Sequence, residues 1–137
     1  MEKINLDKIC AEYGMKIQEK VKDADKKKLK ELETVITNAL GVLVEDGPFA
    51  FAIFLESRKG KNEPNEYDNL IELTKNFLSD ESINLLLSTE KSANLSDLLL
   101  KITDDIPKLI LAKTLLEKML IYARYKAKAM QREAGEE

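Results

Sequence analysis

The side chains with the clearest chemical potential are basic ones near the C-terminal end of the sequence. With a rotation of about 100° per residue, they lie beside an apolar stripe on one predicted helix. Such a ridge suits a phosphate backbone, because each Lys or Arg that meets a phosphate releases counterions without reading the bases. Basic residues in the last turns of a helix also interact favourably with its macrodipole. Spacing alone therefore favours the interpretation that this face is exposed to solvent and binds no ligand. The ridge contains Lys113, Glu117, Arg124, Lys128, Gln131 and Arg132.

The net charge of −3 hides an uneven distribution of charge along the chain. Residues 20–30 contain six basic and two acidic residues, and residues 106–132 contain seven basic residues and one acidic residue. Between them, residues 31–105 contain six basic and fifteen acidic residues. The overall charge argues mildly against a nucleic-acid partner, whereas the two basic segments are consistent with one.

The side chains on which most enzymes depend are missing. The sequence has no His, which removes the commonest general base, the commonest metal ligand and the Ser/His and Cys/His nucleophile pairs. Three acidic pairs fall at predicted helix ends: Glu45-Asp46, Asp80-Glu81 and Asp104-Asp105. At these positions a role in helix capping is a better explanation than a pair of catalytic carboxylates for hydrolysis. We therefore expect no catalytic residue, no metal and no cofactor. A carboxylate magnesium site is the one catalytic alternative left open.

The elements that must position the basic side chains are helices. The chain of 137 residues is 44% hydrophobic and 34% charged, which is typical of one soluble globular domain. Five Gly and three Pro are too few turn-formers for a many-stranded β fold. We expect an all-α fold, a single compact helical bundle over residues 1–137 with a frayed tail at 134–137. Its second and C-terminal helices are expected to be long, with several short helices between them.

Apolar residues spaced by three and four place the individual helices. Gly47-Pro48 separates the second helix from the third, which is expected to be short and buried on nearly all sides. Asn94 with Asp97 resembles a capping box. The lone Cys10 is expected to be a small apolar residue of the first helix. The predicted helices cover roughly 5–22, 25–46, 48–56, 67–78, 83–87, 95–102 and 105–132, with loops at 57–65 and 88–94.

The last predicted helix has more apolar surface than one neighbour needs. Its core stripe is Leu109, Ala112, Leu116, Met119, Leu120, Ala123, Ala127 and Met130. A second apolar strip contains Leu111, Leu115 and Tyr122, with Ile110 and Ile121 towards the basic face. The helix is therefore either central in the bundle or shared with a partner subunit. The candidate protein-partner surface consists of Leu111, Leu115, Ile121 and Tyr122.

Three stretches of the sequence resemble parts of a known family. The segment from Ala11 to Val21 resembles an Ala-rich first helix that contains Tyr, and Asp46 to Leu55 resembles in layout a turn followed by an Ala-Phe-Leu helix. The segment from Leu115 to Ala129 resembles a last helix that is apolar and basic. Together they resemble the small subunit of the Cmr complex, the type III-B CRISPR-Cas effector that binds and cuts RNA. The similarity spans nearly the whole chain.

The resemblance implies a non-catalytic cytoplasmic subunit in antiviral defence, present in several copies and packed against other Cmr subunits. It would line a basic channel that holds guide RNA and target RNA, with no membrane and no small-molecule substrate involved. Its contacts would be to phosphate only, because the guide selects the sequence. By residue type and position, the candidate contacts are Arg124, Lys126, Lys128 and Arg132, then Lys113 and Lys118, with Lys26, Lys27 and Lys28 as a second patch. The alternative is a helical protein–protein adaptor of a different complex, without nucleic-acid contact.

Overall fold

Helices make up nearly all of the secondary structure of the described residues. The computed structural model describes residues 5–17, 26–85 and 93–134. Within these ranges there are six helices and no strand, so the predicted all-α fold is confirmed. The helices are α1 (Leu6–Met15), α2 (Lys26–Asp46), α3 (Pro48–Arg58), α4 (Glu66–Leu78), α5 (Leu95–Ile102) and α6 (Ile106–Ala134).

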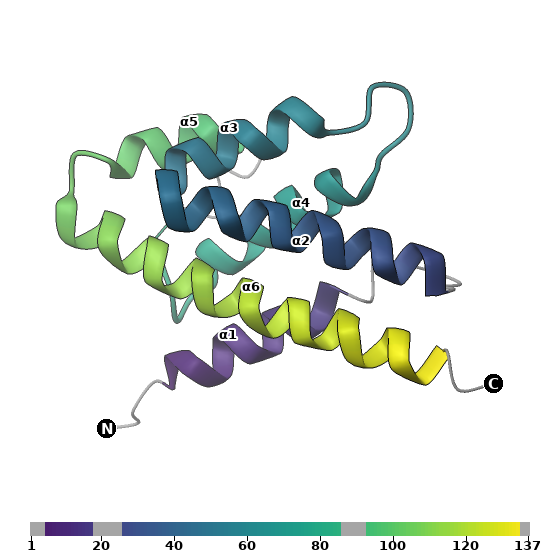
Figure 1. The fold of residues 1–137 in the computed structure, drawn as a ribbon. Coiled ribbons are helices and arrows are strands. Elements are labelled where there is room, and N and C mark those ends of the chain that lie inside the picture. The colour runs from purple at the N-terminus through teal and green to yellow at the C-terminus, as the bar shows by residue number, and fades with distance from the viewer. Residues whose placement is uncertain (1–4, 18–25, 86–92, 135–137) are drawn as a thin grey trace.

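The long helix α6 lies between α1 on one side and α2 on the other (Figure 1). Helix α3 packs between α2 and α5, and α4 lies behind α2, where it contacts α3, α2 and α1 (Figure 1). This position explains the wide apolar surface of α6, because two neighbours cover two sectors of its circumference. Of the predicted core stripe, Leu109 and Met130 are half-buried. The other six residues are buried: Ala112, Leu116, Met119, Leu120, Ala123 and Ala127.

Helices α1 and α6 approach each other closely at Gly14. A Cβ atom added to Gly14 would lie 2.7 Å from the Met119 carbonyl oxygen, 2.8 Å from the Tyr122 Cβ and 2.9 Å from the Ala123 nitrogen. Real Cβ atoms essentially never make contacts shorter than 3.0 Å. The absence of a side chain at Gly14 therefore sets how deeply α1 packs onto α6.

Helix α3 begins where the sequence predicts, but one of its faces is open. Gly47 has a φ of +95°, which a residue with a side chain rarely adopts, and Pro48 occupies the first turn of α3. Phe49 and Ile53 are 37% and 46% exposed, so the expectation of burial on nearly all sides is wrong. The cause is that α2, α4 and α5 leave part of the circumference of α3 uncovered.

The helix starts show which predicted caps form. At α1, the Asn5 side chain accepts a hydrogen bond from the Lys8 amide at 3.0 Å and caps the helix. At α4, Asn65 and Asp68 form a full capping box. No such box forms at α5, where Asn94 is the N-cap but its side chain makes no capping bond.

A contact from another helix supplies part of the cap that Asn94 does not. The Ser96 amide donates to the Glu56 carboxylate of α3 at 3.2 Å. This bond satisfies one free amide of the first turn of α5 and places a negative charge at its N-terminus. The capping of α5 therefore depends on the tertiary fold.

Several predicted helix boundaries need correction. Helix α1 ends at Met15 and continues only as a short 3₁₀ turn at 16–17, while residues 18–22 lie outside the described ranges. The predicted loop at 57–65 begins after Arg58, because α3 extends further. The predicted helix at 83–87 is replaced over 80–85 by turns that Asp80 stabilises and that end at Asn84 with a φ of 51°. Residues 86–92, with most of the second predicted loop, are outside the described ranges, as are 135–137 of the tail.

Candidate nucleic-acid interface

The two basic segments of the sequence meet at one end of the bundle. Helices α2 and α6 run antiparallel, so the start of α2 lies beside the end of α6 (Figure 1). The Gln131 side-chain amide of α6 donates to the Glu33 carboxylate at 2.8 Å and to the Leu29 carbonyl at 3.4 Å, both on α2. We name the resulting surface the basic end, which consists of Lys26, Lys27, Lys28, Lys30, Arg124, Lys128 and Arg132.

The two helix segments that form the basic end carry a net positive charge. Residues 26–33 and 124–133 together contain eight basic and three acidic residues. All members of the basic end are exposed except Arg124, which is half-buried. Side chains with this exposure can reach a phosphate without moving the backbone.

The three lysines of α2 at the basic end lie side by side in the sequence. Lys26, Lys27 and Lys28 are the first described residues of α2, and all three are exposed. Together with the basic residues near the end of α6 they create a positive potential, which attracts anions.

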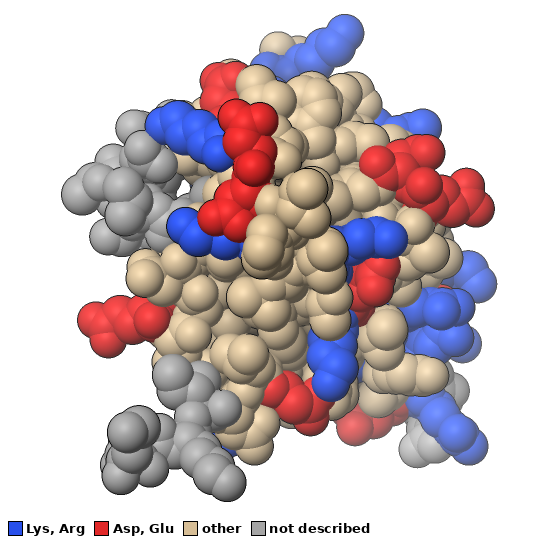
Figure 2. Space-filling model, turned by 90° about the vertical axis from the view of Figure 1, so that its left-hand side faces the viewer, with Lys and Arg blue, Asp and Glu red and all other residues tan. Residues whose placement is uncertain are grey.

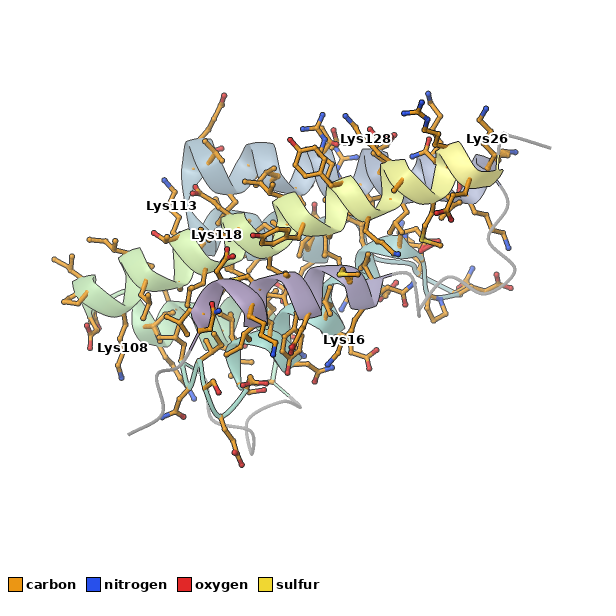
Figure 3. The ribbon with its side chains drawn as sticks, turned by 90° about the horizontal axis from the view of Figure 1, so that it is seen from below. Lys16, Lys26, Lys108, Lys113, Lys118 and Lys128 are labelled. Carbon is orange, nitrogen blue, oxygen red and sulfur yellow. The ribbon has the colours of Figure 1, made fainter. Side chains whose placement is uncertain are left out.

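The labelled lysines in Figure 3 separate into different sides of the molecule. Lys26 and Lys128 lie towards the upper right of this view, Lys113 lies at the left, and Lys16 and Lys108 lie below α1 and at the lower left. Lys126 precedes Lys128 by two residues, a rotation of about 200° on a helix. Lys126 is half-buried and faces away from the basic end, so one flat ligand cannot touch both Lys126 and Lys128.

Two predicted phosphate contacts are already engaged within the protein. The Lys118 ammonium lies 3.0 Å from the Asp7 carboxylate, which also accepts a hydrogen bond from the Tyr122 hydroxyl at 2.8 Å. The Tyr122 bond and then Lys118 lower the pKa of Asp7, and Asp7 raises the pKa of Lys118. Lys113 pairs with Glu117 on the next turn, with 3.8 Å between charged atoms. Lys118 therefore links α6 to α1, and the charge of Lys113 is partly balanced locally.

Arg124 lies in a groove between α2 and α6 that sequence reasoning did not find. The groove has a volume of about 230 Å³ and is lined by Lys30, Glu33, Thr34, Thr37, Asn38 and Arg124. The Arg124 Nε is inaccessible to solvent and has no hydrogen-bond partner among the described residues. Lys30 was missing from the predicted contacts, although its position four residues after Lys26 places it on the same face of α2.

The predicted protein-partner surface is only partly on the surface. Leu115 is 4% exposed and belongs to the core, because α1 covers this side of α6, so its prediction as a surface residue is wrong. Tyr122 is half-buried against α1. Leu111 and Ile121 remain exposed at 39% and 41%.

Further exposed apolar residues extend this surface along α6. Ile106, Ile110 and Tyr125 are more than half exposed, and Ile110, Ile121 and Tyr125 share one face. Figure 2 shows that uncharged residues occupy much of the middle of the end of the molecule where α6 begins. An exposed apolar surface of this kind is a feature of protein-binding sites.

Catalytic and metal-binding groups are scarce in the described ranges. Among the described residues no group of three or more His, Cys, Asp or Glu side chains is placed to hold a metal ion. Cys10 is fully buried, and burial raises the pKa of its thiol, so the reactive thiolate is disfavoured. Of the helices in the described ranges, none combines the length and apolar character needed to cross a membrane.

The fold and the site define an all-α protein with a basic end built from its two longest helices. Comparison of the chain with models of protein families, with curated proteins and with solved structures finds no match.

Proposed function

We propose that this chain is a non-catalytic RNA-binding subunit of a larger ribonucleoprotein, with the basic end as its contact to the RNA backbone. Support comes above all from the pairing of α2 with α6, which gathers basic residues about 100 positions apart in the chain into one surface. The exposure of Lys26, Lys27 and Lys28 beside the basic residues of α6 also supports an anionic partner, because like charges gathered on one surface attract a ligand of opposite charge.

The particular assembly that we propose is the cytoplasmic Cmr effector of type III-B CRISPR-Cas systems, in antiviral defence. This part of the proposal rests on the resemblance of the sequence to the small subunit of that complex. Catalysis would then belong to other subunits, and this chain would hold guide and target RNA while packing against those subunits and further copies of itself. Single-stranded RNA bound through its backbone requires no reading of bases by this chain.

The proposal is tested by reversing charge at the basic end. Lys26→Glu with Lys128→Glu removes one cation from each helix, and Lys59→Glu with Lys108→Glu is the control with the same change in net charge elsewhere. Fluorescence anisotropy with a mixed-sequence single-stranded RNA measures affinity at several salt concentrations. Loss of two phosphate contacts should reduce the slope of log K against log salt by about 1.4. Equal affinity and equal slope in the two double variants would contradict the proposal.

A second candidate function is a helical adaptor that binds only proteins. The exposed face of Ile110, Ile121 and Tyr125 favours it, since these side chains are 61%, 41% and 66% exposed. In that case reversing charge at the basic end would leave RNA affinity and its salt dependence unchanged. The Ile121→Asp variant would no longer co-purify with neighbouring subunits. Retention of those subunits by Ile121→Asp would count against the adaptor.

A further inference from the structure

The groove between α2 and α6 has the features of a site for one anionic group. It is open to solvent, its volume of about 230 Å³ equals that of about seven water molecules, and a cation stands on each helix. We propose that this groove binds a single phosphodiester group, with Arg124 as its anchor. The inference rests on the proposed function, since it names the point at which the RNA backbone is held.

The Arg124 guanidinium is prepared for a ligand. Its Nε atom is shielded from solvent and has no hydrogen-bond partner in the described part of the chain. Buried donors without partners are rare because the lost bond to water is costly. A turn of the Arg124 side chain towards the groove would release the Nε atom from its shielded position, and a phosphate oxygen would then supply the missing acceptor. The planar fork of a guanidinium matches two phosphate oxygens.

The charge that lines the groove favours an anionic ligand. Lys30 and Arg124 contribute two positive charges, and Glu33 contributes one negative charge. The Glu33 carboxylate accepts the Gln131 amide at 2.8 Å, which holds it at the α6 side of the groove. The net positive charge attracts a phosphodiester, which is the anionic group of an RNA backbone.

The remaining lining residues supply neutral groups. The Thr34 hydroxyl donates to the Lys30 carbonyl at 3.0 Å, so its proton is used within α2. Thr37 and Asn38 present a hydroxyl and an amide to the same groove. These groups can donate to the non-bridging phosphate oxygens or to the attached ribose.

The test observes the Arg124 Nε–H signal directly in a ¹H–¹⁵N NMR spectrum of the full chain. The probes are uridylyl-uridine, which has one phosphodiester, uridine monophosphate and uridine, all at constant ionic strength. Uridylyl-uridine and uridine monophosphate should both shift the signal in a saturable manner, because each carries an anionic phosphate, and uridine should have no effect. Arg124→Lys keeps the charge but removes the fork and the Nε–H signal, so its binding is followed by the backbone amide signals of Thr37 and Asn38. The variant should bind uridylyl-uridine roughly tenfold more weakly. Arg58→Lys, the same substitution at an exposed arginine of α3 outside the basic end, is the matched control and should change nothing.

Each result separates the groove from the wider proposal. An Arg124 signal that ignores uridylyl-uridine, or that responds equally to uridine, would overturn the groove as a phosphodiester site. Unchanged uridylyl-uridine binding in Arg124→Lys, with a native melting curve, would overturn Arg124 as its anchor. If uridylyl-uridine shifts the Arg124 signal but charge reversal at the basic end leaves RNA affinity unchanged, the groove is supported and the proposed function is rejected. If uridylyl-uridine leaves the Arg124 signal unchanged but charge reversal lowers RNA affinity, the groove is rejected and the basic end is supported.

Discussion

The close approach of α1 and α6 makes Gly14→Ala the most quantitative test of the packing. The new methyl group would lie 2.7 to 2.9 Å from the Met119 oxygen, the Tyr122 Cβ and the Ala123 nitrogen. None of these atoms can rotate away, so the two helices must separate, and overpacking of this kind costs about 3 kcal/mol at the upper end of its usual range. Ala gains at most about 1 kcal/mol over Gly in a helix. The net expectation is a loss of about 2 kcal/mol.

Gly41→Ala is the matched control, since the same substitution is made inside another helix. A Cβ atom at Gly41 meets nothing within 4 Å, and the residue is exposed. The variant should gain up to about 1 kcal/mol through helix propensity and a less flexible unfolded chain. The two variants should therefore differ by about 3 kcal/mol in unfolding free energy, although their chemistry is identical.

Thermal and urea unfolding followed by circular dichroism would measure the difference. At about 4 °C per kcal/mol for a chain of this size, Gly14→Ala should melt about 8 °C below the parent and Gly41→Ala up to about 4 °C above it. The urea midpoint should move in the same directions with an unchanged slope. Equal melting temperatures for Gly14→Ala and the parent would refute the close packing of α1 on α6.

Two further predictions concern pH and capping. Burial, and then the 2.6 Å hydrogen bond to Asp80, raises the pKa of Tyr13 to about 12. The contribution of the Tyr13 hydroxyl to the unfolding free energy is therefore complete below pH 10 and is lost as the pH rises from 10 to about 12. The unfolding free energy of the parent minus that of Tyr13→Phe should therefore shrink between pH 9 and pH 11, and a constant difference would contradict this cause. Asn65→Ala should cost about 1 kcal/mol in urea unfolding because it breaks the capping box, while Asn94→Ala should stay within about 0.5 kcal/mol. Equal losses in both would show that Asn65 does not act as a cap.

Periodicity predicted most of the fold because each long helix shows one apolar stripe to a core. The predicted core stripe of α6 was correct at the positions that are buried. The pattern could not show which neighbouring helix covers the second apolar strip of α6. Helix α1 covers Leu115 and leaves Ile121 open, and this choice depends on the depth that Gly14 permits. The assignment of each apolar strip to the core or to the surface therefore required the tertiary structure.

The candidate site was predictable in its residue types but not in its grouping. Net charge by segment identified both basic regions, and only the antiparallel pairing of α2 with α6 unites them. Lys118 looked equivalent to Lys128 in the sequence, but its partner Asp7 is 111 residues away. Capping by Glu56 at α5 is likewise a contact between distant segments, so local patterns predicted the wrong cap.

The most direct test of the central proposal maps the RNA contact surface on the intact chain. A ¹H–¹⁵N NMR titration with single-stranded RNA should perturb residues 26–33 and 124–132 most strongly, and the changes should diminish as salt is raised. Signals of Lys108 and Lys118 should move least, since one lies on another side and the other is paired with Asp7. Perturbations centred on Ile110 and Ile121, or no perturbation at low salt, would contradict a basic end that binds RNA.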